Sequence, residues 1–265
     1  MRMAELDENE SLVEQLFRED FGFQIEKIPE GGARSADFSA FDGENYYLIE
    51  LKTKYRSADE MSERESQLDE KGLAEFSRSI ERRSNITKNI SDALRQIESS
   101  DPDTEILRIV FFLLRDFDAN ERWKNILANL YGIETVVDWS DDNAGKECYY
   151  FHDSDYYRYR DRLDAAIILI ATSDKAVLCL NDHSQNIDAL RESPLVEKFG
   201  AGVIDPTKDE ALGEIWIVSG GIERSNEQAV IAYLREKYSL SERTMAMNMG
   251  YASATVVVPI KRDTR

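Results

Sequence analysis

The 265-residue sequence contains few of the residues that cross-link, bend or interrupt a chain. Its two cysteines, Cys148 and Cys179, are too few for a disulfide framework and have apolar or aromatic neighbours, which is typical of buried thiols in a reducing compartment. Only 5 prolines and 13 glycines occur, without a Pro/Gly/Ser-rich linker, so we expect a continuously structured chain. With only 2 histidines, a histidine-dependent catalytic triad is nearly excluded unless His152 or His183 serves in it.

A long apolar segment is also missing. The longest uninterrupted apolar run, from Ala165 to Ala171, is far shorter than the roughly 20 residues that span a bilayer as a helix. The first ten residues, MRMAELDENE, are charged throughout and do not resemble a signal peptide. We therefore expect a soluble, cytoplasmic protein with no membrane partner.

Positive charge is in short supply. The sequence has 52 acidic and 33 basic residues, and the net charge of −19 excludes a protein that coats nucleic acid or anionic lipid through a broad basic face. A local exception lies at residues 78–95, which hold five basic and two acidic side chains, and Lys52, Lys54 and Arg56 add to it. This basic strip could follow a phosphate backbone, or it could form ion pairs within a helix, and both interpretations stay open.

An apolar fraction of 42% is enough for a folded core, and its periodicity predicts the elements of the first part of the chain. Leu12, Val13 and Phe17 have helical spacing, and the pair Asp42-Gly43 between two apolar runs indicates a tight turn. The charge-dense residues 56–83 favour a solvated helix or a mobile arm. We expect a helix at 9–21, strands at 23–28, 36–41 and 46–52, a helix at 85–98, and a buried strand at 106–114.

The second part of the chain also alternates strands and helices. Whether it extends the first sheet or forms its own core is left open by the sequence. We place a soft boundary at 115–118, which gives a first domain of residues 1–117 and a C-terminal α/β domain of residues 118–265 for recognition or oligomerisation. The expected strands are 133–139, 148–151, 165–171, 176–180, 202–204, 214–218 and 254–260, and the expected helices are 121–131, 187–199 and 226–238.

Three chemically active side chains fall on one predicted hairpin. Glu50 and Lys52 are two residues apart on a strand, so their side chains share one face of the sheet. The turn at Asp42-Gly43 makes the preceding strand an antiparallel neighbour, which brings Asp37 close to Glu50. The sequence therefore predicts two carboxylates and an ammonium group at one end of this hairpin.

Close carboxylates repel each other unless a cation lies between them. Oxygen ligands with room for water suit Mg²⁺ or Mn²⁺ better than zinc. The neighbouring Lys52 could help to deprotonate a water molecule or stabilise charge on a phosphate. Metal-assisted hydrolysis of a phosphodiester uses groups of this kind. Alternatively, Glu50 and Lys52 are an exposed pair on a strand, and Asp37 caps a turn.

The order of elements and the D-x12-E-x-K spacing of Asp37, Glu50 and Lys52 resemble the PD-(D/E)xK nuclease superfamily. The resemblance covers roughly residues 5–115. It implies a restriction-endonuclease-like core of helix, three-stranded meander, helix and strand, with a C-terminal α/β extension or second domain. It also implies that Asp37, Glu50 and the backbone carbonyl of Leu51 bind Mg²⁺ or Mn²⁺ and that Lys52 is catalytic.

Three further positions follow from the resemblance. Members of the superfamily commonly add a glutamate from the first helix, and Glu10 and Glu14 lie one turn apart there; we prefer Glu10. Some members carry a glutamine on the helix after the motif, where Gln96 is the nearby candidate. The superfamily's proline before the aspartate is replaced here by Ala36.

The sequence thus predicts a metal-dependent endonuclease of the restriction or defence type that acts on DNA. The alternative is a catalytically inactive module of the same fold, which would bind a protein or nucleic-acid partner. A homodimer is compatible with the sequence. The arrangement of Asp37, Glu50 and Lys52 should separate the two candidates. Carboxylates within about 5 Å of each other, with Lys52 beside them in an open cleft, favour the enzyme, whereas divergent or buried, ion-paired positions count against it.

Overall fold

The computed structural model describes residues 7–29, 35–53, 66–70, 73–100, 106–115, 118–140, 145–173, 175–248 and 250–257. These residues form a mixed α/β structure, as the alternation of expected strands and helices predicted. Lys54 and Arg56, which the sequence analysis added to the basic strip, lie outside the described residues.

The elements have the following bounds. One large sheet contains β1 (Gln24–Lys27), β2 (Phe38–Phe41), β3 (Tyr46–Lys52), β5 (Ile106–Leu114), β8 (Ala165–Ile170), β9 (Lys175–Leu180) and β10 (Val203–Ile204). The smaller sheets contain β4 (Leu73–Ser79), β6 (Glu134–Asp138), β7 (Lys146–Tyr149), β11 (Trp216–Ile217), β12 (Thr244–Ala246) and β13 (Tyr251–Val257). The helical elements are α1 (Glu8–Gln15), η1 (Leu16–Asp20), α3 (Ser84–Ser100), α4 (Ala119–Tyr131), α5 (Asp155–Arg158), α6 (Ile187–Glu192), α7 (Pro194–Phe199), η2 (Gly200–Gly202), α8 (Pro206–Ala211) and α9 (Glu227–Tyr238).

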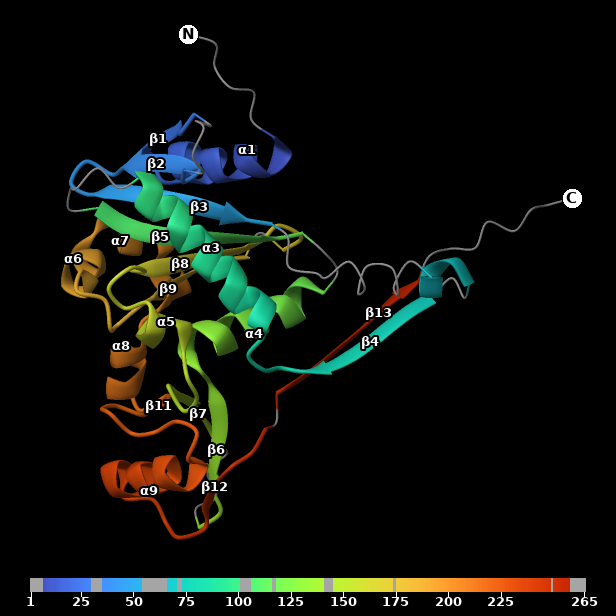
Figure 1. Ribbon diagram of the computed structural model, residues 1–265, viewed down its shortest axis with the longest axis vertical. Helices are drawn as coiled ribbons and strands as arrows, with labels where there is room; N and C mark the ends of the chain where they lie inside the picture. Colours follow the sequence, from blue (N-terminus) through green and yellow to red (C-terminus); the bar gives the residue numbers. More distant parts are fainter. Residues whose placement is uncertain are drawn as a thin grey trace, which may run out of the picture.

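The seven-stranded sheet has the order β1-β2-β3-β5-β8-β9-β10 (Figure 1). β1, β2 and β3 form the expected antiparallel meander, and β3, β5 and β8 are parallel neighbours at its centre. All residues of β5 except Arg108 are buried, because helices cover both faces of the sheet at this point. Parallel central strands and covered faces explain the long apolar run that predicted this strand.

One face of the sheet is covered by the first helical segment. Asp7 is the N-cap of α1: its side chain accepts the N–H groups of Asn9 and Glu10, and the Glu10 side chain accepts the N–H of Asp7 in return. The helix expected at 9–21 continues as the π-helical turn η1, which brings Phe17 against Phe111 of β5. The segment then ends near Gly22, the expected stop, where φ is +77°.

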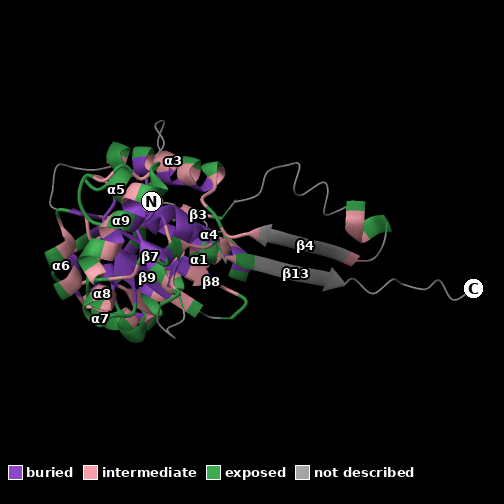
Figure 2. Ribbon diagram, turned by 90° about the horizontal axis from the view of Figure 1, so that it is seen from below, coloured by how far each residue is buried: buried purple, intermediate pink, exposed green. Residues whose placement is uncertain are grey.

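α3 covers the opposite face. Its buried stripe of Ile86, Ile90, Leu94 and Ile97 follows the helical spacing of the sequence and packs in one core cluster with Leu48, Val110 and Phe112 of β3 and β5. Figure 2 shows buried residues gathered between the sheet and its helices, while α3 turns its intermediate and exposed residues outward. α3 thus lies directly over the face of β3 that carries Glu50 and Lys52.

The large sheet continues across the boundary expected near residue 117. β8 and β9 come from the second part of the chain, and β8 pairs with β5 from Ile109 opposite Ala165 to Leu114 opposite Ile170. Both hydrophobic core clusters also draw residues from both parts. The second part therefore extends the first sheet, and the division at residue 117 does not separate two sheets.

Several local expectations were wrong. Within 56–83, residues 66–70 are helical as expected, but residues 73–79 form strand β4, which pairs with β13 in a ribbon that extends away from the rest of the structure (Figure 1). The helix expected at 187–199 is two helices, because Ser193 is extended and Pro194 starts the second one. β12 had no clear apolar signal and was not expected.

None of the described helices combines the length and the apolar character that a bilayer-spanning helix needs.

Candidate functional site

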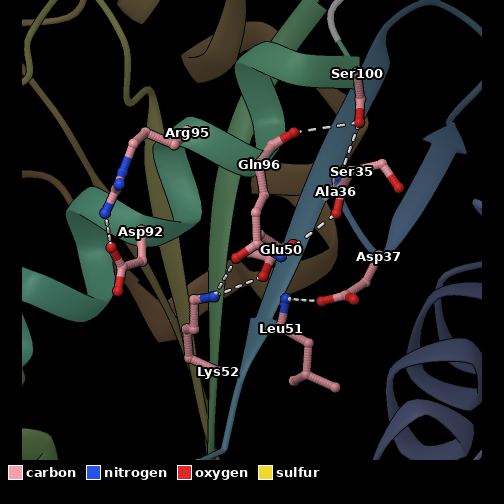
Figure 3. A network of polar contacts seen from close by, with 10 residues as sticks. All are labelled: Ser35, Ala36, Asp37, Glu50, Leu51, Lys52, Asp92, Arg95, Gln96 and Ser100. Carbon is pink, nitrogen blue, oxygen red and sulfur yellow. Dashed lines mark hydrogen bonds and ion pairs between the residues drawn. The ribbon is translucent and has the colours of Figure 1, made fainter. Parts of the chain in front are cut away.

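Asp37 and Glu50 lie side by side on neighbouring antiparallel strands. β2 and β3 pair with Phe38 opposite Ile49, so Asp37, just before β2, falls beside Glu50. The backbone N–H of Asp37 donates to the Ile49 carbonyl at 3.1 Å, and the Asp37 carboxylate accepts the N–H of Leu51 at 2.7 Å (Figure 3). The side chain of Asp37 therefore continues the ladder of hydrogen bonds past the end of β2, and this bond fixes its position.

Lys52 reaches the same place from the same strand. Its Nζ donates to Glu50 Oε1 at 2.6 Å and to Gln96 Oε1 at 3.0 Å (Figure 3). Gln96 comes from α3, and its amide also donates to the Ser35 carbonyl at 3.5 Å. Gln96 of α3 thus accepts a hydrogen bond from the Lys52 ammonium group, which ties this helix to the end of β3.

Burial raises the pKa of both carboxyl groups. The pKa of Glu50 rises from 4.5 to about 8, because the side chain is buried and because the negative charge of Asp37 is close; the Lys52 ammonium group opposes the shift. Burial also raises the pKa of Asp37, while the hydrogen bond from Leu51 and one shared with Glu50 act in the other direction. The two close carboxyl groups, with Glu50 at 2% exposure, therefore bind a proton more readily as a pair than isolated carboxyl groups do.

Of the two first-helix glutamates, Glu10 is the one near Asp37. The negative charge of Glu10 contributes to the raised pKa of Asp37, after burial and the other contacts. Glu10 also forms an ion pair with Lys27 of β1 at 2.6 Å, whereas Glu14 pairs with Arg18. Glu10 therefore contributes charge at the edge of the carboxyl pair and is tied to β1.

The oxygen atoms gathered here fit a divalent cation. Oε2 of Glu50 is buried, and no donor group among the residues that the structure describes hydrogen-bonds to it. In a β-strand, the N–H and C=O groups of one residue point toward the same neighbouring strand. Because the N–H of Leu51 donates to Asp37, the carbonyl of Leu51 also points to the side of Asp37. No cluster of three or more His, Cys, Asp or Glu suited to a metal occurs among the described residues. A cation would thus have two carboxylates, a carbonyl and water as ligands, a set that suits Mg²⁺ or Mn²⁺.

The basic strip expected at 78–95 is largely engaged in ion pairs. Arg82 contacts the buried carboxylate of Asp155 at 3.4 Å, and Arg83 lies 3.9 Å from Glu121. Arg95 pairs with an aspartate one turn earlier on α3. Only the Arg95 pair is the ion pairing within a helix that the sequence analysis left open, because Arg82 and Arg83 precede α3 and pair with residues of α5 and α4.

Two serines in the network were missed by the sequence analysis. Ser100 Oγ, at the end of α3, accepts the N–H of Ala36 at 2.8 Å and donates to the Gln96 carbonyl at 3.3 Å. Ser35 accepts the Gln96 amide. These contacts join residues about 60 positions apart, so no local pattern in the sequence could reveal them. Together they fasten the start of β2 to α3.

Comparisons of the chain with protein-family models, with curated proteins and with solved structures find no match in any of the three.

Proposed function

We propose that this protein hydrolyses phosphodiester bonds of DNA with Mg²⁺ or Mn²⁺, as an endonuclease of the restriction or defence type. The observation that carries the proposal is the convergence of Asp37 and Glu50, with Lys52 Nζ 2.6 Å from one carboxyl oxygen. Two close carboxylates in a buried position destabilise each other, and a divalent cation between them would remove that cost. Converging carboxylates beside an ammonium group are what metal-assisted phosphodiester hydrolysis requires.

The order of elements supports a restriction-endonuclease-like core. α1, the meander β1-β2-β3, α3 and β5 follow one another as the resemblance implies, with β4 inserted between β3 and α3. The motif residues lie on the meander, and α3 covers the face that they share. We therefore propose membership of the PD-(D/E)xK superfamily for this part of the chain.

Each residue of the proposed site has a separable role. Asp37, Glu50 and the Leu51 carbonyl would hold the cation, which would supply Lewis-acid catalysis. The ammonium group of Lys52 stabilises negative charge that develops on the phosphate, and it favours the ionised form of Glu50. Gln96 positions Lys52 by accepting one of its protons at 3.0 Å.

A specific observation also supports the second candidate, an inactive binding module of the same fold. Glu50 is buried, and its ion pair with Lys52 satisfies both groups in part without a metal. In that case the three residues stabilise the hairpin, and a protein or nucleic-acid partner binds elsewhere.

Cleavage of plasmid, linear and single-stranded DNA in Mg²⁺ or Mn²⁺ tests the proposal. Lys52→Ala and Asp37→Ala should each reduce the rate by at least about a hundredfold, because each removes a group that acts on the reacting phosphate. Lys208→Ala and Asp188→Ala, at exposed positions of α8 and α6, are matched controls and should cleave like the wild type. Cleavage that survives both Lys52→Ala and Asp37→Ala discards the proposed site, and a wild type inactive on every substrate favours the binding module.

A further inference from the structure

A cavity of about 200 Å³ lies at the carboxyl-terminal ends of β3 and β5. Its lining includes Asn9 in the first turn of α1, Thr53 just after β3, Arg115 just after β5, and Arg122 in α4. α4 begins at Ala119, which also lines the cavity, so the positive end of this helix dipole faces it. The cavity therefore combines two guanidinium groups with an amide and a hydroxyl group, and Asp118, the ion-pair partner of Arg122, also lines it.

This cavity adjoins the proposed catalytic site. Thr53 directly follows Lys52 in the chain, so their Cα atoms are about 3.8 Å apart. Lys52 pairs with Phe112 at the end of β5, two residues before the chain reaches Leu114 of the cavity. In α/β sheets, ligands bind outside the carboxyl ends of the parallel strands, and both features lie at that edge.

The two arginines differ in how firmly they are held. Arg115 donates to Glu8 at 2.7 Å and to Asn9 at 3.1 Å; its side chain is 36% exposed and that of Glu8 is 82% exposed. A surface pair of this kind contributes little stability, so the guanidinium group can exchange Glu8 for another anion. Arg122 is 11% exposed and pairs with Asp118 at 3.2 Å, which fixes it in the wall of the cavity.

We propose that this cavity binds one backbone phosphate of the nucleic-acid strand, next to the phosphodiester held at Asp37, Glu50 and Lys52. The inference rests on the proposed function and names a second contact of its substrate. Guanidinium forks match the oxygen atoms of a phosphate. The volume is below the range of about 300–1,000 Å³ that suits drug-sized ligands, so a phosphate group fits and a nucleoside does not.

Two readouts on the full chain test the inference. The first is binding of inorganic phosphate, followed by ³¹P NMR. Arg115→Gln should weaken it about tenfold or more, because a charge-assisted pair is lost. Glu8→Gln should strengthen it, because the competing carboxylate is removed. Arg95→Gln, at an exposed site of α3, is the matched control.

The second readout is the salt dependence of single-stranded oligonucleotide binding, measured in the Lys52→Ala background to prevent cleavage. Adding Arg115→Gln should make the slope of log affinity against log salt shallower by about 0.7, the value expected for one lost phosphate contact. Arg122→Gln breaks a largely buried ion pair and can therefore destabilise the fold. It is measured only together with Arg122→Lys, which keeps the positive charge.

The outcomes separate this inference from the proposed function. Lack of phosphate binding by the wild type, or slopes that are equal with and without Arg115→Gln, would overturn the inference even if the protein cleaves DNA. If Arg115→Gln alters the salt slope but the protein never cleaves DNA, the result supports phosphate binding in the cavity and rules out the catalytic proposal. An increase in phosphate affinity on Glu8→Gln supports the inference, because loss of folding cannot produce it.

Discussion

At the scale of single residues, Glu50 is a buried carboxyl group whose ionised form is costly to the folded protein. A carboxyl group with 2% exposure, a carboxyl neighbour and one oxygen without a donor destabilises the folded protein once it ionises. A buried apolar or amide side chain at this position would avoid that cost. Such local costs are common at functional sites, where binding a cation or substrate offsets them.

The raised pKa of Glu50 predicts how stability depends on pH in the absence of metal. Its pKa rises from 4.5 to about 8 on folding, so its contribution is most favourable below pH 4.5 and is lost as the pH rises towards 8. In EDTA at pH 8, we expect Glu50→Gln to be more stable than the wild type by up to about 4 kcal/mol, since each pKa unit corresponds to about 1.4 kcal/mol. Urea unfolding at pH 5 and pH 8 measures this difference. Glu192→Gln, at an exposed end of α6, is the control, and a Glu50→Gln variant less stable than wild type at both pH values contradicts the account.

At the scale of elements, α3 both covers the core and positions the lysine. Its apolar stripe packs on β3 and β5, and this packing places Gln96 within hydrogen-bond distance of Lys52. The contacts of Ser100 with Ala36 and of Gln96 with Ser35 hold the start of β2 against the same helix. The helix thus fixes three parts of the candidate site relative to one another.

Removing the Gln96 acceptor should impair turnover more than substrate binding. We expect Gln96→Leu to lower kcat by about 10- to 100-fold with little change in KM, because the ammonium group of Lys52 loses its orientation. Gln96→Glu keeps an acceptor oxygen and should restore most of the rate. Lys88→Leu, at an exposed position of α3, controls for added apolar surface. Equal rates for Gln96→Leu and Gln96→Glu would show that the acceptor has no such role.

The elements also show which parts of the fold can be predicted from the sequence. β3 and β5 were predicted with the bounds that the structure has, because each is a dense apolar run between clear breaks. The approach of Asp37 to Glu50 followed from the turn and the alternation of side chains. β4 could not be predicted, because its charged sequence becomes a strand only by pairing with β13 at the other end of the chain. The partners of Arg82 and Gln96 likewise depend on distant segments that no local pattern specifies.

At the scale of the whole molecule, the sheet unites the two parts of the chain. β8 completes the parallel pairing of β5, and both core clusters combine residues from either side of residue 117. The net charge is −19, and Arg82 and Arg83 form ion pairs with Asp155 and Glu121 within the protein. Contact with nucleic acid would therefore be local, at the carboxyl edge of β3 and β5, and would depend on a cation to reduce repulsion.

A fragment of residues 1–117 should fail to fold alone. Without β8, the buried edge and faces of β5 would be open to water, and part of both core clusters would be missing. We expect a fragment with narrow amide dispersion in NMR spectra and no cooperative thermal transition, whereas the full chain unfolds cooperatively. A cooperatively folded fragment would instead establish the division at residue 117 as a true domain boundary.

The most direct test of the central claim is calorimetric titration of the full chain with Mg²⁺. The wild type should bind Mg²⁺, and Asp37→Asn and Glu50→Gln should each abolish the binding, because each removes one of the two carboxylates proposed as ligands. Asp188→Asn, at an exposed position of α6, should bind like the wild type. A wild type that takes up no Mg²⁺, or uptake that is intact in both Asp37→Asn and Glu50→Gln, would contradict the proposed metal site.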